Sequence, residues 1–291
     1  MEMNQNRLVE NLIWDAYEHG TRTIYIYPKS GKFEIAYRFK NNTEKLIELQ
    51  EETMLSLKTA IEKASVALES EDSRRMLVRE SAESSANVLQ VRYQKIETIS
   101  GPRLTIWIWQ PEKDVMELEK INSGNADVLK EFKSWTKKTN GLFIVTGAPG
   151  SGKTTTTYSL LNEFKNAGCN VFTVEDSVQM IVDGINQIET NIESSDKFDA
   201  VFKKIYASDP DVICLGLTNY TGYEENVFTA CYRAAASGHV VILQMDKATV
   251  TEARETLSKF SSLPFNDVIK GISAQRLIEK DGKVKAEYNF S

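Results

Sequence analysis

The second half of the chain alternates between short apolar runs and amphipathic stretches. Apolar runs predict strands at residues 142–146, 170–174, 185–189, 211–215 and 239–244. Stretches with apolar residues three or four positions apart predict helices at residues 126–138, 153–167, 196–207, 223–236 and 249–260. Such alternation predicts an α/β fold in which helices cover both faces of a mostly parallel sheet.

In the first half of the chain, apolar and polar residues alternate within shorter segments. The pattern predicts a helix to about residue 20, a hairpin over 23–39, a helix over 54–68 and a strand pair at 88–93 and 104–109. Residues 69–86 are polar and acidic, and we expect a loop or an exposed helix there. The resulting division is a small N-terminal α/β domain over 1–110, a charged linker over 111–125 and a second domain over 126–291. Asp281-Gly282 predicts a last hairpin.

Composition narrows the class of protein. The chain has 291 residues, 41% hydrophobic and 26% charged, as in soluble two-domain proteins. A net charge of −6 argues against nucleic-acid binding. No apolar run approaches a membrane span and the N-terminus lacks signal-peptide features, so a cytoplasmic protein is expected. With three scattered cysteines and two histidines, no zinc site is expected.

The segment after the predicted strand at 142–146 has the phosphate-loop pattern G-x-x-x-x-G-K-[ST], and a predicted helix follows it. Its glycines let backbone N–H groups converge at a helix N-terminus, which favours anions. We therefore expect ATP and Mg²⁺ to bind there, with Lys153 on the β- and γ-phosphates and Thr154 on the metal. The predicted cofactor-binding residues are Gly147, Ala148, Pro149, Gly150, Ser151, Gly152, Lys153, Thr154 and Thr155.

Three further segments are candidates for the chemistry. Glu175 and Asp176 end the predicted strand at 170–174, and strand carboxyl ends face the ligand crevice of a parallel sheet. Either acid suits a base or a water-mediated metal contact, or alternatively a helix cap. His239 begins an apolar strand, where a histidine is either structural or catalytic. The strand after Asp209-Pro210-Asp211 ends without an acid.

These segments, in this order, resemble the secretion-superfamily ATPases, the motors of type II secretion and type IV pilus assembly. Residues 141–161 match the family's phosphate-loop neighbourhood, and residues 173–176 look like its aspartate box. Residues 209–213 resemble the opening of its Walker B segment, and Gly238-His239 the start of its histidine box. Residues 271–277 resemble a late family helix, and the likeness is faint before residue 110.

The resemblance implies a RecA-like second domain and a small PAS-like α+β first domain that closes over the nucleotide. It implies that Arg92, and also Arg38, lie near the phosphates. It assigns catalytic roles to Glu175, His239 and Arg92, and a metal contact to Thr154 and Glu175. Family members act as ring hexamers docked on an inner-membrane platform protein, so a homo- or hetero-oligomeric ring at the inner membrane is expected.

The chain also departs from the family pattern. Leu217 stands where the Walker B glutamate is usual, Asp246 replaces the second histidine of the histidine box, and the four-cysteine zinc module is missing. Ala207 and Trp107 each replace a usual arginine. Losing a general base costs about 10²–10⁴ in rate, and so we expect weak or lost hydrolysis. We expect Leu217→Glu to raise hydrolysis if the rest of the site is intact.

Two alternatives remain open. If it is not an ATPase of weak or lost hydrolysis, the chain is an active motor that uses Glu175 as its base, or a non-motor scaffold or regulatory subunit that nucleotide stabilises. We also expect a monomer or low oligomer in isolation, because the chain lacks the zinc module and two arginines of the family pattern.

Overall fold

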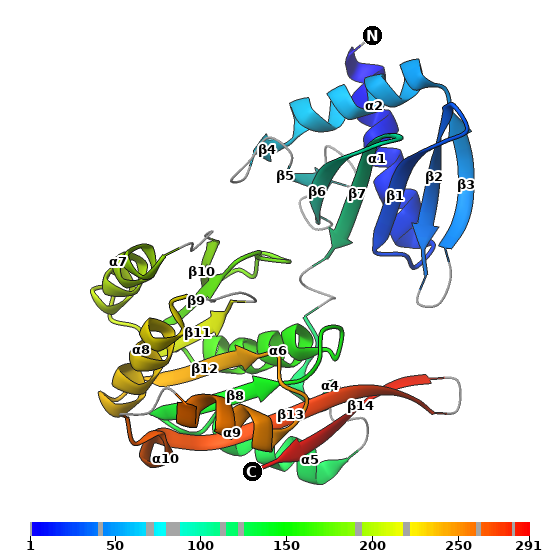
Figure 1. Cartoon of the computed structure of the whole chain (residues 1–291). Helices are drawn as coiled ribbons and strands as arrows, with labels where there is room; N and C mark the ends of the chain where they lie inside the picture. Colours follow the sequence, from blue (N-terminus) through cyan, green and yellow to red (C-terminus); the bar gives the residue numbers. More distant parts are fainter. Residues whose placement is uncertain are drawn as a thin grey trace. The chain divides into compact units, whose positions relative to one another are not determined.

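The structure, a computed structural model, describes residues 2–39, 43–67, 73–79, 88–110, 115–121, 125–189, 194–217, 222–259, 263–280 and 283–291. The chain forms two compact units (Figure 1). The first consists of Met1–Asp114 with Gln179–Ile181, and the second of Val115–Val178 with Val182–Ser291.

In its described residues, the first unit is an antiparallel sheet of seven strands with two helices on one face. The strand order is β3-β2-β1-β7-β6-β5-β4, and every neighbouring pair is antiparallel. The strands are β1 (Thr23–Lys29), β2 (Lys32–Arg38), β3 (Thr43–Leu49), β4 (Val66–Ala67), β5 (Ser73–Arg79), β6 (Val88–Thr98) and β7 (Gly101–Trp109). The helices are α1 (Glu2–Glu18) and α2 (Glu51–Ala64), and both contribute to one apolar core with the strands.

Local sequence explains the predicted hairpin of this unit. Ser30 and Gly31 connect β1 to β2, with φ angles of 51° and 76°. Positive φ at both central residues is the geometry of a type I′ turn, whose twist matches the flanking strands. Ile24 and Ile26 alternate with more exposed residues on β1 and are fully buried.

Three strands of the first unit differ from the sequence-based expectation. Residues 73–79 form β5 rather than a loop or exposed helix, and β3 was not predicted. The helix expected over 54–68 ends at Ala64 as α2, and Val66–Ala67 form β4. In β5, Met76 and Val78 are buried while Leu77 between them is 60% exposed. The three arginines of this segment make it polar on average, and only its alternation shows the strand.

The second unit contains a mixed sheet in the order β10-β9-β11-β12-β8-β13-β14. Its strands are β8 (Gly141–Thr146), β9 (Val171–Glu175), β10 (Asn186–Glu189), β11 (Val212–Gly216), β12 (Val240–Met245), β13 (Ile269–Lys280) and β14 (Lys283–Phe290). All neighbouring pairs are parallel except β13 with β14. The expected α/β fold with a mostly parallel sheet is confirmed.

Helices cover both faces of this sheet. Its helices are α4 (Leu118–Ile121), α5 (Ala126–Trp135), α6 (Lys153–Asn166), α7 (Ser195–Tyr206), α8 (Glu224–Ala236), α9 (Val250–Lys259) and α10 (Phe265–Val268). Helices α7, α8 and α9 share one apolar core with Leu142 and Ile144 of β8. Phe143 points the other way and packs against Trp135 of α5, with ring centroids 5.0 Å apart. Helix α4 lies inside the expected linker, and its Leu118 and Ile121 are buried.

The late segment 271–277 is a strand, so its expected helix is wrong. It belongs to β13, which pairs in parallel with β8. Gly271 passes so close to Trp135 that an added Cβ would lie 2.5 Å from the indole nitrogen. The final hairpin is confirmed as β13 with β14, although Asp281-Gly282 lies outside the described residues.

Candidate functional site

The phosphate loop leaves β8 and enters α6 at the carboxyl edge of the sheet. The Ser151 N–H donates to the Ala148 carbonyl over 3.1 Å, which makes a tight turn. Gly150 and Gly152 have φ angles of 78° and 88°, a region that favours glycine. The first turn of the 14-residue helix α6 holds no acidic side chain. The loop therefore presents a helix N-terminus suited to an anion.

A residue from the other end of the unit supports this loop. The Gln275 side chain on β13 is buried, and its Nε2 donates to the Ser151 carbonyl over 2.9 Å. A Cβ added to Gly147 would lie 2.5 Å from the Gln275 carbonyl oxygen, so this glycine allows a close backbone approach. The sequence analysis missed Gln275, because 124 residues separate it from Ser151.

Lys153 contacts the loop and one carboxylate. Its Nζ donates to the carbonyls of Gly147 and Ala148 over 2.8 and 3.1 Å. It also pairs with Asp246 Oδ1 at 2.8 Å. The Lys153 side chain is 11% exposed and that of Asp246 is 44% exposed. In the sequence, Asp246 was noted only as a departure from the family pattern. In the structure it contacts Lys153 of the phosphate loop.

Thr146, the last residue of β8, holds the chain on either side of Asp246. Its Oγ1 lies 3.0 Å from the Met245 carbonyl and 2.7 Å from the Lys247 carbonyl. The Lys247 N–H donates back to the same oxygen over 3.1 Å. The hydroxyl thus joins the phosphate-loop strand to the turn after β12.

Glu175 ends β9 inside a buried polar cluster. Its Oε2 accepts from the Tyr158 hydroxyl of α6 over 2.9 Å, and its Oε1 accepts from the Thr173 hydroxyl over 2.6 Å. Gln187 Nε2 donates to the Tyr158 oxygen over 2.9 Å. The carboxylate is therefore positioned from both the phosphate-loop helix and its own strand.

Burial raises the pKa of Glu175 above its usual range, against hydrogen bonds from Thr173, Tyr158 and Gln187 that lower it. A raised pKa makes a carboxylate a better proton acceptor near neutral pH. Glu175 also lies beside Gly216 on β11, where an added Cβ would be 3.1 Å from Glu175 Cγ. The structure thus places Glu175 next to the strand end that lacks an acid, and Asp176, which follows β9, is partly buried.

Leu217 follows β11 and is 4% exposed. It belongs to the apolar core that contains Val227 and Phe228 of α8. Thr218–Thr221 lie outside the described residues. The environment of Leu217 is hydrocarbon, which disfavours a carboxylate at this position. We expected Leu217→Glu to raise hydrolysis, but the apolar packing around Leu217 would destabilise the folded protein when it carries a glutamate.

His239 lies at the opposite edge of the sheet from the phosphate loop. It precedes Val240, whose partner on β8 is Gly141, while the loop follows Thr146. Six strand residues at about 3.3 Å each separate the two ends. The His239 Nδ1 lies 2.8 Å from the Pro210 carbonyl, and its ring packs against Tyr206. The structure does not bring this histidine to the chain's own phosphate loop.

The two arginines expected near the phosphates belong to the first unit. Arg92 lies on β6, partly buried, opposite Arg75 and Trp107 on the neighbouring strands. Arg38 is the last residue of β2 and is exposed. Their reach to a nucleotide stays a prediction.

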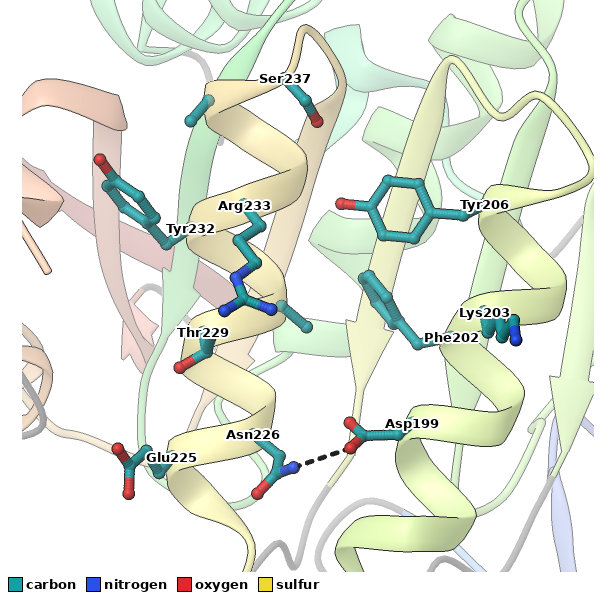
Figure 2. Close-up of a pocket in the computed structure, with 12 residues that line it drawn as sticks. Asp199, Phe202, Lys203, Tyr206, Glu225, Asn226, Thr229, Tyr232, Arg233 and Ser237 are labelled. Atoms are coloured by element: carbon teal, nitrogen blue, oxygen red, sulfur yellow. Dashed lines mark hydrogen bonds between the residues drawn. The ribbon is translucent and has the colours of Figure 1, made fainter.

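Figure 2 shows a groove between α7 and α8, with a volume of about 950 Å³. Asp199 of α7 and Asn226 of α8 bridge it by a hydrogen bond of 3.1 Å. Tyr206 and Ser237 line its other end, and Tyr206 packs on His239. The groove therefore reaches the edge of the sheet opposite the phosphate loop, and it is separate from the candidate site.

Among the residues that the structure describes, no three histidine, cysteine or acidic side chains are grouped so that they could hold a metal ion. None of the helices described is both long and apolar enough to cross a bilayer.

The whole chain resembles known proteins. The family model described as Type II/IV secretion system protein matches residues 2–287. The chain is 24% identical over 279 residues to the type IV pilus assembly ATPase TfpB of Acinetobacter baylyi, covering 94% of this chain and 46% of TfpB. It is 26% identical over 286 residues to the type II secretion system protein E of Xanthomonas campestris, covering 97% and 49%. The chain thus spans about half the length of these curated relatives.

Solved structures share the fold. The pilus retraction motor PilT with bound ADP aligns with a TM-score of 0.72 and 20% identity, over 97% of this chain and 82% of PilT. The ATPase DotB of Legionella pneumophila aligns with a TM-score of 0.70 and 16% identity, over 97% of this chain and 80% of DotB. At these identities the likeness shows a common fold.

Proposed function

The chain belongs to the type II/IV secretion system protein family, and on that premise we propose that it binds ATP with Mg²⁺ at the phosphate loop and hydrolyses it weakly or not at all. The second unit is then a RecA-like nucleotide-binding domain, and the first a PAS-like domain of the secretion-ATPase type. The antiparallel sheet of the first unit, with both helices on one face, supports that second assignment.

The observation that carries the proposal is the arrangement around Lys153. A cation that is 11% exposed lies against loop carbonyls at the N-terminus of α6, where backbone N–H groups favour phosphate. Gly150 has no atom within 4 Å of the position a Cβ would take, so the outer side of the loop is open. Lys153 suits the β- and γ-phosphates, and the partly exposed Thr154 suits the metal. Mg²⁺ would supply charge neutralisation at those phosphates.

Two departures from the family pattern, at Leu217 and Ala207, support weak hydrolysis. The buried Leu217 side chain, which follows β11, provides neither a proton acceptor nor a metal ligand. Ala207, which caps α7, stands where the family pattern has an arginine. Losing an arginine that stabilises charge costs about 10³–10⁵ in phosphoryl transfer.

One observation favours an active motor instead. Glu175 is buried beside Gly216 and has a raised pKa, as a general base requires. Against this, both of its oxygens already accept hydrogen bonds from Tyr158 and Thr173. An active motor would have to release one of these contacts for a water molecule.

By family, we propose that the chain joins a homo- or hetero-oligomeric ring on the cytoplasmic side of an inner-membrane platform protein. Arg92 and Arg38 are then candidates to approach the nucleotide. In isolation we propose a monomer or low oligomer that forms a ring only with nucleotide or with a catalytic relative.

Nucleotide binding is tested by Lys153→Ala. Ligand at 100 times its Kd stabilises a protein by about 2.7 kcal/mol, and the variant should lose this Mg²⁺·ATP-dependent rise in Tm. Lys138→Ala removes an exposed lysine of the same unit and should keep the rise. No rise for the wild type at millimolar Mg²⁺·ATP would overturn the proposal. Steady-state phosphate release from the wild type, measured beside its nucleotide affinity, separates the weak ATPase from the active motor.

A further inference from the structure

The partner of Lys153 is unusual in its placement. Asp246 comes one residue after β12, and β12 lies between the phosphate-loop strand β8 and the acid-free strand β11. Its Oδ1 is 2.8 Å from the ammonium that the proposed nucleotide would use. A negative charge therefore lies within hydrogen-bond distance of the lysine that is expected to bind the phosphates.

This carboxylate is fixed in place from both sides. The Thr146 hydroxyl bonds to Met245 and to Lys247, the two chain neighbours of Asp246. Thr146 is also the residue directly before the phosphate loop. The backbone on both sides of Asp246 is therefore tied to the strand that leads into the phosphate loop, which keeps this residue beside the loop.

Glu175 does not share this position. Its oxygens accept from Tyr158 and Thr173 within a buried cluster. Asp246 is 44% exposed, and Lys153 is its ion-pair partner among the described residues. Of the two carboxylates, Asp246 is the one that contacts Lys153.

We propose that Asp246 makes the phosphate loop select Mg²⁺-bound nucleotide over metal-free nucleotide. This inference rests on the proposed ATP site. A triphosphate must take Lys153 from Asp246, which leaves the carboxylate beside anionic phosphate oxygens without its cation. Metal-free ATP meets that repulsion in full, because close like charges in a partly desolvated site repel. A nucleotide that carries Mg²⁺ brings a cation that the carboxylate attracts directly or through a metal-bound water.

The test compares ATP affinity of the full chain with Mg²⁺ and with EDTA, by calorimetric titration. The measured quantity is the Kd for ATP in EDTA divided by the Kd for ATP with Mg²⁺. Asp246→Asn removes the charge and keeps the shape, and the ratio should fall about tenfold, mainly through tighter metal-free binding, as expected for removing a repulsive charge a few Å away. Asp246→His removes the negative charge with a different shape and should act in the same direction. Asp199→Asn removes an exposed charge from the groove between α7 and α8 and should leave the ratio unchanged.

The outcomes separate this inference from the proposed function. If wild-type protein binds Mg²⁺·ATP and Asp246→Asn changes the ratio less than threefold, the selection role is wrong while ATP binding stands. Equal weakening of both Kd values would also overturn it, since that result marks Asp246 as a general support of the loop. If wild-type protein binds ATP in neither condition, the proposed function itself fails.

Discussion

The two edges of the parallel sheet differ in whether polar side chains gather into clusters. At the carboxyl edge, Tyr158 and Thr173 bond to Glu175 and Asp246 pairs with Lys153, in addition to the bonds that side chains there make to backbone carbonyls. At the amino edge, side chains mostly bond to backbone. His239 contacts the Pro210 carbonyl, and Asn170 Nδ2 donates to the carbonyls of Ser208 and Asp209 over 2.9 and 2.8 Å.

This difference sorts residues that sequence motifs group together. A side chain that bonds to a loop carbonyl fixes the shape of a turn, whereas a buried cluster of carboxylate, hydroxyl and amide can hold a ligand or a proton. The Asp209-Pro210-Asp211 segment and His239 both resemble catalytic motifs, yet both lie at the amino edge. In a parallel sheet, the end of the strand on which a motif residue lies therefore matters as much as its identity.

The largest expected effect is at the carboxyl edge, where Leu217→Glu would put an unpaired charge into the apolar core. We expect a loss of about 3–5 kcal/mol in the free energy of unfolding, as for other uncompensated buried charges. Urea denaturation measures it. Leu217→Met keeps the hydrocarbon and should lose less than about 1.5 kcal/mol. A Leu217→Glu variant as stable as the wild type would show that this strand end admits an acid.

Glu175→Ala should have the next largest effect. It leaves the Tyr158 and Thr173 hydroxyls without their acceptor in a buried site, and a loss of about 2–3 kcal/mol is expected. The same denaturation measurement applies. Tyr158→Phe removes one hydroxyl of the cluster as a control and should lose about 1 kcal/mol. Equal losses for the two variants would argue against a carboxylate that joins both hydroxyls.

The pH dependence of stability reports on the same carboxylate. Burial raises the folded-state pKa of Glu175 above its ordinary value of 4.5, so the folded state holds the proton to higher pH than the unfolded state. Stability that comes from this group is therefore full below pH 4.5 and falls as pH rises toward the folded pKa. Relative to Glu175→Gln, the wild type should lose stability as pH increases above about 4.5. A difference that stays constant with pH would contradict the raised pKa.

The smallest expected effect is at the amino edge. His239→Asn can keep a hydrogen bond to the Pro210 carbonyl, so we expect a stability change of about 1 kcal/mol or less. The Kd for Mg²⁺·ATP should not change, because the residue lies a strand length from the loop. A change of tenfold or more in that Kd would show that a residue of the amino edge does contribute to nucleotide binding.

The sequence was most informative where structure is local. Periodicity predicted five parallel strands and five helices of the second unit, because a buried strand or an amphipathic helix leaves its pattern within about ten residues. The same approach missed β5, where arginines raise the polarity of an alternating segment. The family resemblance, in turn, assigned residues 271–277 to a helix, although they belong to β13 and pair with β8.

The candidate site was predicted only in part. The phosphate loop is a contiguous motif, and it lies between β8 and α6 as expected. The partners that act on it come from far along the chain, Asp246 after β12 and Gln275 on β13. Their proximity follows from the strand order β12-β8-β13, which one sequence does not reveal.

The position of Gln275 has a consequence for biosynthesis. A nascent chain that has left the ribosome only to about residue 260 contains the whole phosphate loop but not β13, which borders β8 and carries the amide under Ser151. Contacts this distant in sequence form late, since a long loop must close first. We therefore expect the proposed nucleotide site to be among the last parts of the second unit to mature, because a half-made chain lacks the Gln275 contact that supports the loop.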